Sequence, residues 1–315
     1  NKIIKKLKKS IIFPGQGSQY PGMGKYLHDN FDYVKKLHDE VNSALDLNLT
    51  NIIFDTDNKE AINLTQNTQP AIMLTSYAIF TVLKKEKGID ICNFNFCAGH
   101  SLGEYTALLI SNSLKLADTA KILFNRGKFM QQAAPVGEGA MIAVLNVECN
   151  EVEKFINENN FKNVEISNDN CPGQIVLSGK ASDVKALAIS FKNDLKKKSV
   201  PLPVSAPFHC TLMKKAEEEM KKYLANVVVN KPSIPIISNF VASAQNDPTK
   251  IKELLIKQIC GRVRWRESIL YMNKEGINKI VEIGPSKTLT NMMKRFKLDL
   301  KTINLESIDD IKNYD

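Results

Sequence analysis

The stretch Cys97-Ala98-Gly99-His100-Ser101-Leu102-Gly103-Glu104-Tyr105 decides the fold that the sequence predicts. It follows a short apolar run at residues 91–96, which predicts a strand, and continues into residues 102–110, which predict a helix. Glycine on both sides of Ser101 allows a sharp turn, so we expect the hydroxyl to stand at the end of the strand in a nucleophile elbow. At the helix start, the N–H of Leu102 is placed to stabilise negative charge on an attacked carbonyl oxygen. A tight turn with a capping serine is the plainer interpretation of so short a pattern.

The composition limits the class of protein. A chain of 315 residues with 43% hydrophobic residues can bury a large core, and no apolar run is long enough to cross a bilayer. The net charge of +9 comes without interleaved aromatic and basic residues, so we expect surface charge and no binding to nucleic acid or membranes. The six cysteines form no CxxC pair and the four histidines lack metal-ligand spacing. This predicts reduced thiols in a non-secretory compartment and no metal site.

Two other glycine positions indicate close contact of the backbone. The loop Pro14-Gly15-Gln16-Gly17-Ser18-Gln19 follows a short strand at residues 11–13. Its N–H groups suit an anion, although a plain strand-to-helix turn explains the loop as well. Gly127 lies inside a helix predicted from Asp118, as its cap, to about residue 134, where glycine is unfavourable relative to alanine. We therefore expect the helix to approach a neighbouring element at Gly127. The preceding Arg126 is, by itself, typical of a surface charge.

The order of the predicted elements indicates an α/β fold. Strands alternate with helices over most of the chain, which predicts a mainly parallel sheet in three layers. Residues 139–205 change to the order strand, helix, strand, strand, helix, strand, which is typical of a ferredoxin-like unit. We predict a discontinuous α/β-hydrolase-like large domain at residues 1–135 and 206–315. A small ferredoxin-like α+β subdomain is inserted at residues 136–205.

A serine nucleophile needs a base, and histidine has a suitable pKa. His209 follows the inserted unit, at the point where the chain returns to the large domain, and clefts between domains often hold binding sites. His100 adjoins Ser101, and we expect the two side chains to point apart. An acidic residue could orient His209, and the candidates between Ser101 and His209 are Asp118, Asp169, Asp183 and Asp194. None of them lies in a convincing strand-end loop, so a backbone carbonyl is an acceptable alternative.

Several motifs together carry a resemblance to a known family. The chain resembles the malonyl-CoA:acyl-carrier-protein transacylases, which load malonyl groups for type II fatty acid synthesis. The likeness covers nearly the whole chain and follows the family's order through Phe13-Pro14-Gly15-Gln16-Gly17-Ser18-Gln19, Thr68-Gln69-Pro70-Ala71, Gly99-His100-Ser101-Leu102-Gly103-Glu104-Tyr105, Arg126-Gly127-Lys128-Phe129-Met130-Gln131, Asn170-Cys171-Pro172-Gly173-Gln174, Pro201-Leu202-Pro203-Val204-Ser205, His209 and Glu282-Ile283-Gly284-Pro285.

The resemblance implies a catalytic pair and its supporting groups. Ser101 would be the acylated nucleophile and His209 its base. The backbone N–H groups of Gln16 and Leu102 would form the oxyanion hole, and the main-chain carbonyl of Gln258 would orient His209. The implied reaction is a ping-pong transfer through a malonyl-serine ester, without a metal or another cofactor.

The resemblance also implies how the substrate is chosen. Arg126 would grip the free carboxylate of the malonyl group with two parallel hydrogen bonds, and Phe208, Met130 and Asn170 would line the pocket. The implied partners are malonyl-CoA and an acidic, phosphopantetheinylated acyl carrier protein, and the implied state is a monomer. Tolerance of methylmalonyl stays open.

Two rival functions and two locations remain from the sequence. A serine hydrolase would use Ser101 with water as the acceptor, and a carrier-binding scaffold would bind without turnover, although it would be expected to lack the serine, the histidine or the arginine. The chain begins at Asn1 with a basic stretch at residues 2–9. We expect a protein imported into a plastid or mitochondrion after removal of a transit peptide, with the bacterial cytoplasm as the alternative.

Overall fold

The computed structural model describes residues 7–204 and 206–315, so most of the basic stretch at residues 2–9 lies outside it. Within this part, the larger of two sheets has six strands. Five are parallel, and the last is antiparallel to its neighbour. In spatial order they are β11 (Lys301–Leu305), β10 (Lys279–Ile283), β1 (Lys9–Phe13), β2 (Phe96–Gly99), β7 (Ile236–Ile237) and β8 (Ala244–Gln245).

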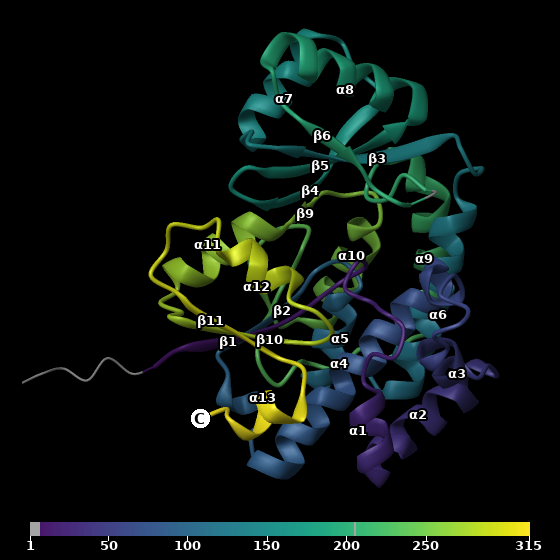
Figure 1. The fold of residues 1–315 in the computed structure, drawn as a ribbon, viewed down its shortest axis with the longest axis vertical. Helices are drawn as coiled ribbons and strands as arrows, with labels where there is room; N and C mark the ends of the chain where they lie inside the picture. The colour runs from purple at the N-terminus through teal and green to yellow at the C-terminus, as the bar shows by residue number, and fades with distance from the viewer. Residues whose placement is uncertain (1–6, 205) are drawn as a thin grey trace, which may run out of the picture.

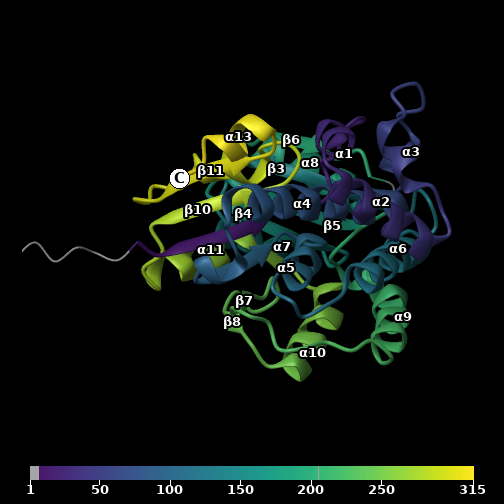
Figure 2. The same cartoon turned by 90° about the horizontal axis from the view of Figure 1, so that it is seen from below.

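Helices cover both faces of this sheet (Figures 1 and 2). Ile11 and Phe13 of β1 point into a core shared with α4 (Thr65–Lys87) and α5 (Gly103–Ile110). Ile12, between them, points into a second core with α11 (Trp265–Lys274) and α12 (Thr288–Met293). Alternate residues of one strand are thus buried on opposite faces, as in a sheet covered on both sides. The predicted α/β fold with a three-layer, mainly parallel sheet is confirmed.

Other helices surround these layers. One group, at residues 25–132, packs around α4 and on its neighbours, a second lies between β6 and β9 in the chain, and the last helix of the chain packs on α4 and β11. They are α1 (Lys25–Asn30), α2 (Asp32–Leu45), α3 (Leu49–Phe54), α6 (Leu116–Gln132), α9 (Lys214–Leu224), α10 (Pro248–Gln258) and α13 (Ile308–Lys312), with short 3-10 turns at Ala61–Asn63, Ile91–Asn93 and Thr211–Met213.

The second sheet is built mainly from the predicted inserted unit. Its strands are β6 (Ser199–Pro201), β3 (Gly139–Leu145), β5 (Gln174–Lys180), β4 (Val164–Cys171) and β9 (Val263–Arg264), in that spatial order. The first four pair antiparallel in the order of a ferredoxin-like unit, and α7 (Cys149–Glu158) and α8 (Ala181–Leu195) cover one face (Figure 1). The domain division at 135/136 and 205/206 stays a prediction, and residue 205 lies outside the description.

The structure corrects three local predictions. Residues 91–96 are not one strand, because Asp90 and Asn93 form a capping box that starts the 3-10 turn Ile91–Asn93, and the strand begins only at Phe96. The sequence pattern of residues 263–274 predicts one helix, but Val263 and Arg264 pair with β4 before α11 begins. Asp118 is not the cap of α6, which starts at Leu116 with Lys115 before it. Asp118 lies in the first turn, where its charge suits the helix dipole.

Candidate active site

Ser101 lies in a sharp turn at the carboxyl end of β2. Its φ is 53°, in the left-handed region that few residues other than glycine adopt. A side chain at Gly99 would overlap the backbone of Gly103, and one at Gly103 would overlap the carbonyl of Phe13. The two glycines are therefore required by close backbone contact, as the pattern predicted. The geometry is that of a nucleophile elbow.

His209 completes a hydrogen-bonded pair with this serine. Its Nε2 lies 2.8 Å from Ser101 Oγ, and its Nδ1 lies 2.8 Å from the carbonyl oxygen of Gln258. Since a carbonyl only accepts, Nδ1–H donates to it and Nε2 accepts from the hydroxyl. Burial, and then the nearby Arg126, lower the pKa of His209 to about 3. The imidazole is therefore neutral near pH 7, as a base must be.

Arg126 reaches the same point from α6, and only 1% of its surface is exposed. Its Nη1 donates to Gln69 Oε1 at 2.7 Å, and its Nη2 donates to Gln258 Oε1 at 2.9 Å and to Ser101 Oγ at 3.2 Å. Its Nε has no partner among the described residues. Gly127 explains how α6 comes so near, because a side chain there would overlap the backbone of α4 at Gln66. The close contact predicted at Gly127 is confirmed.

The sequence did not reveal two amide side chains that hold the turn. Asn239 accepts from the N–H of Ser101 at 2.8 Å and donates to the carbonyl of Gly99 at 2.7 Å. The amide of Gln258 donates to the carbonyl of Ser101 at 3.0 Å. Asn239 follows β7 at the carboxyl edge of the sheet, where β2 also ends. This position after a strand was the one sequence feature that could have indicated a residue of the site. For Gln258 only the carbonyl was predicted, and its bond to His209 is present.

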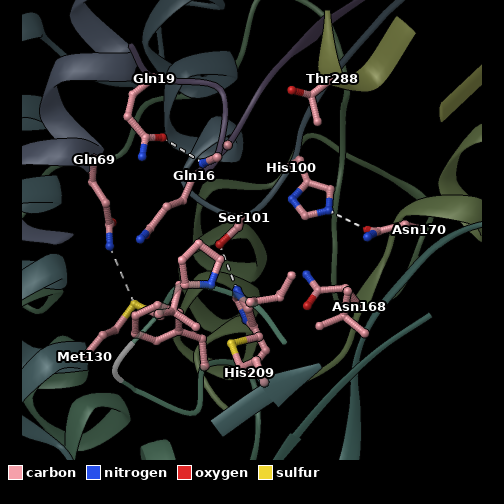
Figure 3. Close-up of a pocket in the computed structure, with 18 of the residues that line it drawn as sticks. Gln16, Gln19, Gln69, His100, Ser101, Met130, Asn168, Asn170, His209 and Thr288 are labelled. Carbon is pink, nitrogen blue, oxygen red and sulfur yellow. Dashed lines mark hydrogen bonds between the residues drawn. The ribbon is translucent and has the colours of Figure 1, made fainter. Parts of the chain in front are cut away.

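A cavity of about 350 Å³ lies between the two sheets, beside Ser101 and His209 (Figure 3). The predicted pocket residues Met130, Asn170 and Phe208 line it, as do Gln16 and Arg126. Leu102 and Gln258 lie behind the wall, fully or almost fully buried. His100 points away from Ser101, as expected, and its Nε2 lies 2.7 Å from Asn170 Oδ1. The lining is mainly apolar with a few convergent polar groups, which is typical of a binding site for a small molecule.

Two kinds of feature are absent from residues 7–204 and 206–315, a metal-binding cluster and a membrane-spanning helix. No group of three or more histidine, cysteine, aspartate or glutamate side chains there could hold a metal ion. No helix of this part is both long and apolar enough to span a bilayer.

The fold and this serine–histidine pair define an acyl transferase, and the family model described as "Acyl transferase domain" matches residues 11–306. The malonyl CoA-acyl carrier protein transacylase of Bacillus subtilis (strain 168) is 40% identical over 309 residues, which are 97% of this chain and 95% of that protein. The chain belongs to the malonyl CoA-acyl carrier protein transacylase family, so the resemblance seen in the sequence is confirmed.

Solved structures agree with this membership. The acyl-carrier-protein-S-malonyltransferase from Bartonella henselae has a TM-score of 0.92 at 39% identity, covering 97% of this chain and 98% of that one. A type II PKS acyl-carrier protein in complex with its malonyl-transacylase includes a chain with a TM-score of 0.91 at 30% identity, covering 97% and 98%. The named relatives with a stated organism are bacterial. They fit the bacterial alternative and give no support to a plastid or mitochondrion.

Proposed function

We propose that this chain is a malonyl-CoA:acyl-carrier-protein S-malonyltransferase that supplies fatty acid biosynthesis through a malonyl-serine ester. One observation carries the proposal: Ser101 Oγ is within hydrogen-bonding distance of both His209 Nε2 and Arg126 Nη2, beside a single cavity. A base and a carboxylate-binding cation at the same nucleophile suit an acyl group that ends in a carboxylate.

The first half-reaction loads the enzyme. His209 Nε2 takes the proton of Ser101 as Oγ attacks the thioester carbonyl of malonyl-CoA. The N–H groups of Gln16 and Leu102 donate to the oxyanion of the tetrahedral intermediate. The carbon–sulfur bond then breaks, and coenzyme A leaves as a thiol with the proton from His209. The carbonyl of Gln258 holds the ring in the required tautomer through both steps.

The second half-reaction repeats these steps with another thiol. His209 takes the proton of the phosphopantetheine thiol of the carrier protein, the sulfur attacks the ester, and Ser101 recovers its proton as the leaving group. No metal or other cofactor takes part in these steps.

Arg126 would select the acyl group. A guanidinium binds a carboxylate through two parallel N–H bonds, whereas an acetyl group offers it no acceptor. Because Arg126 is buried, an acetyl substrate would leave the guanidinium without that partner. Malonyl-CoA should therefore acylate Ser101 much faster than acetyl-CoA. Phe208 and Met130 limit the space beside the malonyl methylene.

Intact-mass spectrometry after brief incubation with malonyl-CoA tests the proposal. The wild type should gain one malonyl group, Ser101→Ala none, and Arg126→Ala at least about tenfold less in the same time. Lys128→Ala, which removes a cation from the same helix, is the matched control and should load normally. Steady release of malonate without an adduct would instead support a hydrolase, and an unmodified protein with intact carrier binding would support a scaffold.

The monomeric state remains a proposal, and for the location the bacterial alternative fits the relatives better than a plastid or mitochondrion does. Light scattering of the purified protein and the location of a tagged chain in its own cells would decide them.

A further inference from the structure

Glu104 is a buried carboxylate to which the mechanism above gives no role. It lies three residues after Ser101, in the first turn of α5, and only 3% of its surface is exposed. Placing an ionised carboxylate in the interior is unfavourable unless nearby groups compensate for the lost water. The N-terminus of α5 supplies part of this compensation through the helix dipole. The rest comes from the groups that bind the carboxylate.

Those groups hold the nucleophile turn. Oε1 of Glu104 accepts from the backbone N–H of Asn239 at 2.6 Å, and Oε2 lies 3.5 Å from Nε2 of Gln258. Asn239 in turn accepts from the N–H of Ser101, and Gln258 donates to its carbonyl oxygen. Both peptide groups of Ser101 are therefore fixed by residues that Glu104 contacts.

The same amide of Gln258 connects Glu104 with Arg126. Its Nε2 faces the carboxylate, while its Oε1 accepts from Nη2 of Arg126 at 2.9 Å. One amide thus separates two buried, opposite charges. The other titratable groups that interact with Glu104 are Tyr105 of α5 and Cys97 of β2. His209 interacts with Arg126 and with His100. Of these, only Arg126 is a cation near pH 7.

We propose that Glu104 is a positioning residue whose negative charge balances Arg126 through the Gln258 amide, and that this balance controls both substrate binding and acylation. The inference rests on the proposed function, since it concerns the same arginine and histidine. When Glu104 is ionised, the field of Arg126 at His209 is reduced, so the imidazolium that forms during acylation is less unfavourable. The substrate carboxylate then also meets a partly compensated guanidinium and binds less tightly.

Protonation of Glu104 reverses both effects. Burial raises the pKa of Glu104 to about 7, opposed by the hydrogen bond from Asn239 and by Arg126. As pH falls through this value, acylation at saturating substrate should slow, and the half-saturating substrate concentration should fall. A bound malonyl carboxylate competes with Glu104 for the same guanidinium. The pKa of Glu104 should therefore be higher in the substrate complex, which the saturating rate reports, than in the free enzyme, which substrate binding reports.

Single-turnover acylation by malonyl-N-acetylcysteamine, followed by intact mass, measures both quantities without the phosphates of coenzyme A. In Glu104→Gln, the saturating rate and the half-saturating concentration should each fall by about three- to tenfold above pH 7. Both should lose their dependence on pH between about 5.5 and about 8.5. Glu282→Gln, a second buried glutamate bonded to Thr290 and Leu289, is the matched control and should keep the wild-type profile.

A residue with only a structural role would raise the half-saturating concentration on substitution and leave the pH profile in place, and this result overturns the proposal. If Glu104→Gln does not fold, the wild type and Arg126→Ala still decide. A flat wild-type profile contradicts the inference, and an ionisation that disappears in Arg126→Ala supports it. Failure of the wild type to form any adduct would count against the proposed function itself, which keeps the two failures distinct.

Discussion

At the scale of single residues, two buried histidines couple folding to pH. Burial lowers the pKa of both His209 and His38 to about 3, with Arg126 contributing at His209 and His28 at His38. In the unfolded chain both return to the ordinary value of 6.5. Both histidines are therefore protonated below pH 6.5 in the unfolded state but stay neutral in the folded state until about pH 3. The stability that the two neutral histidines contribute is complete above this window and falls as pH decreases through it.

This gives a prediction for unfolding in urea. Between pH 7 and pH 5 each histidine should reduce the free energy of unfolding by at most about 2 kcal/mol. His209→Gln should remove one such contribution, and His209→Gln with His38→Gln should remove both. The measurement is the free energy of unfolding of each protein at the two pH values. Equal losses in the wild type and the double variant would contradict the coupling.

At the scale of elements, the contact between α6 and α4 places Arg126. Alanine normally favours a helix interior over glycine, by about 0.5 to 1 kcal/mol. At Gly127, however, the new methyl group would overlap the backbone of α4. We expect Gly127→Ala to destabilise the fold by about 1 to 3 kcal/mol and to reduce malonyl loading, because α6 must move and carries Arg126 with it.

Denaturant unfolding and intact-mass loading test this together. Lys121→Ala, an exposed position on the same helix, is the matched control and should change neither quantity appreciably. A Gly127→Ala protein that is more stable than the wild type would show that helix propensity outweighs the contact, and the proposed placement of Arg126 by Gly127 would be wrong.

The same scale shows what the sequence could predict. Apolar periodicity located most helices and strands. In α2 and α8, for example, the buried residues recur at helical spacing within the helix itself, so neighbouring residues in the sequence are enough to predict them. It failed at β9, a strand of two residues that exists only by pairing with β4, nearly a hundred positions earlier. The motif around Ser101 indicated the nucleophile turn, whereas Asn239 and the Gln258 amide act only after distant segments converge. No local pattern encodes such a contact.

At the scale of the whole molecule, the cavity depends on how the two sheets are held together. Gln16 and Ser101 approach it from the carboxyl edge of the large sheet, while Asn168, Asn170 and Val176 approach it from β4 and β5. Two links join the sheets near this point. The first is β9, a strand of the second sheet that leads directly into α11, which packs on the large sheet. The second is an ion pair between Asp169 of β4 and Arg266 of α11.

The ion pair is bidentate. Nε of Arg266 lies 3.0 Å from Oδ1 of Asp169, and Nη2 lies 2.9 Å from Oδ2. Asp169 is fully buried, so its carboxylate depends on this arginine for compensation. Arg266→Met leaves that charge unpaired in the interior and should destabilise the fold by about 3 to 5 kcal/mol. Asp169→Asn with Arg266→Met removes the unpaired charge as well and should recover most of the loss.

Activity should separate from stability in these variants. β4 carries both Asp169 and the pocket residue Asn170, so a loosened β4 would widen the cavity. The Ser101–His209 hydrogen bond does not involve β4 and should stay formed. The double variant should therefore acylate at saturation within about threefold of the wild type but need more malonyl-CoA to reach half of that rate. Urea unfolding and single-turnover acylation give the two readings. A single Arg266→Met variant as stable as the double variant would mean that water reaches Asp169 and that the ion pair does not hold the sheets.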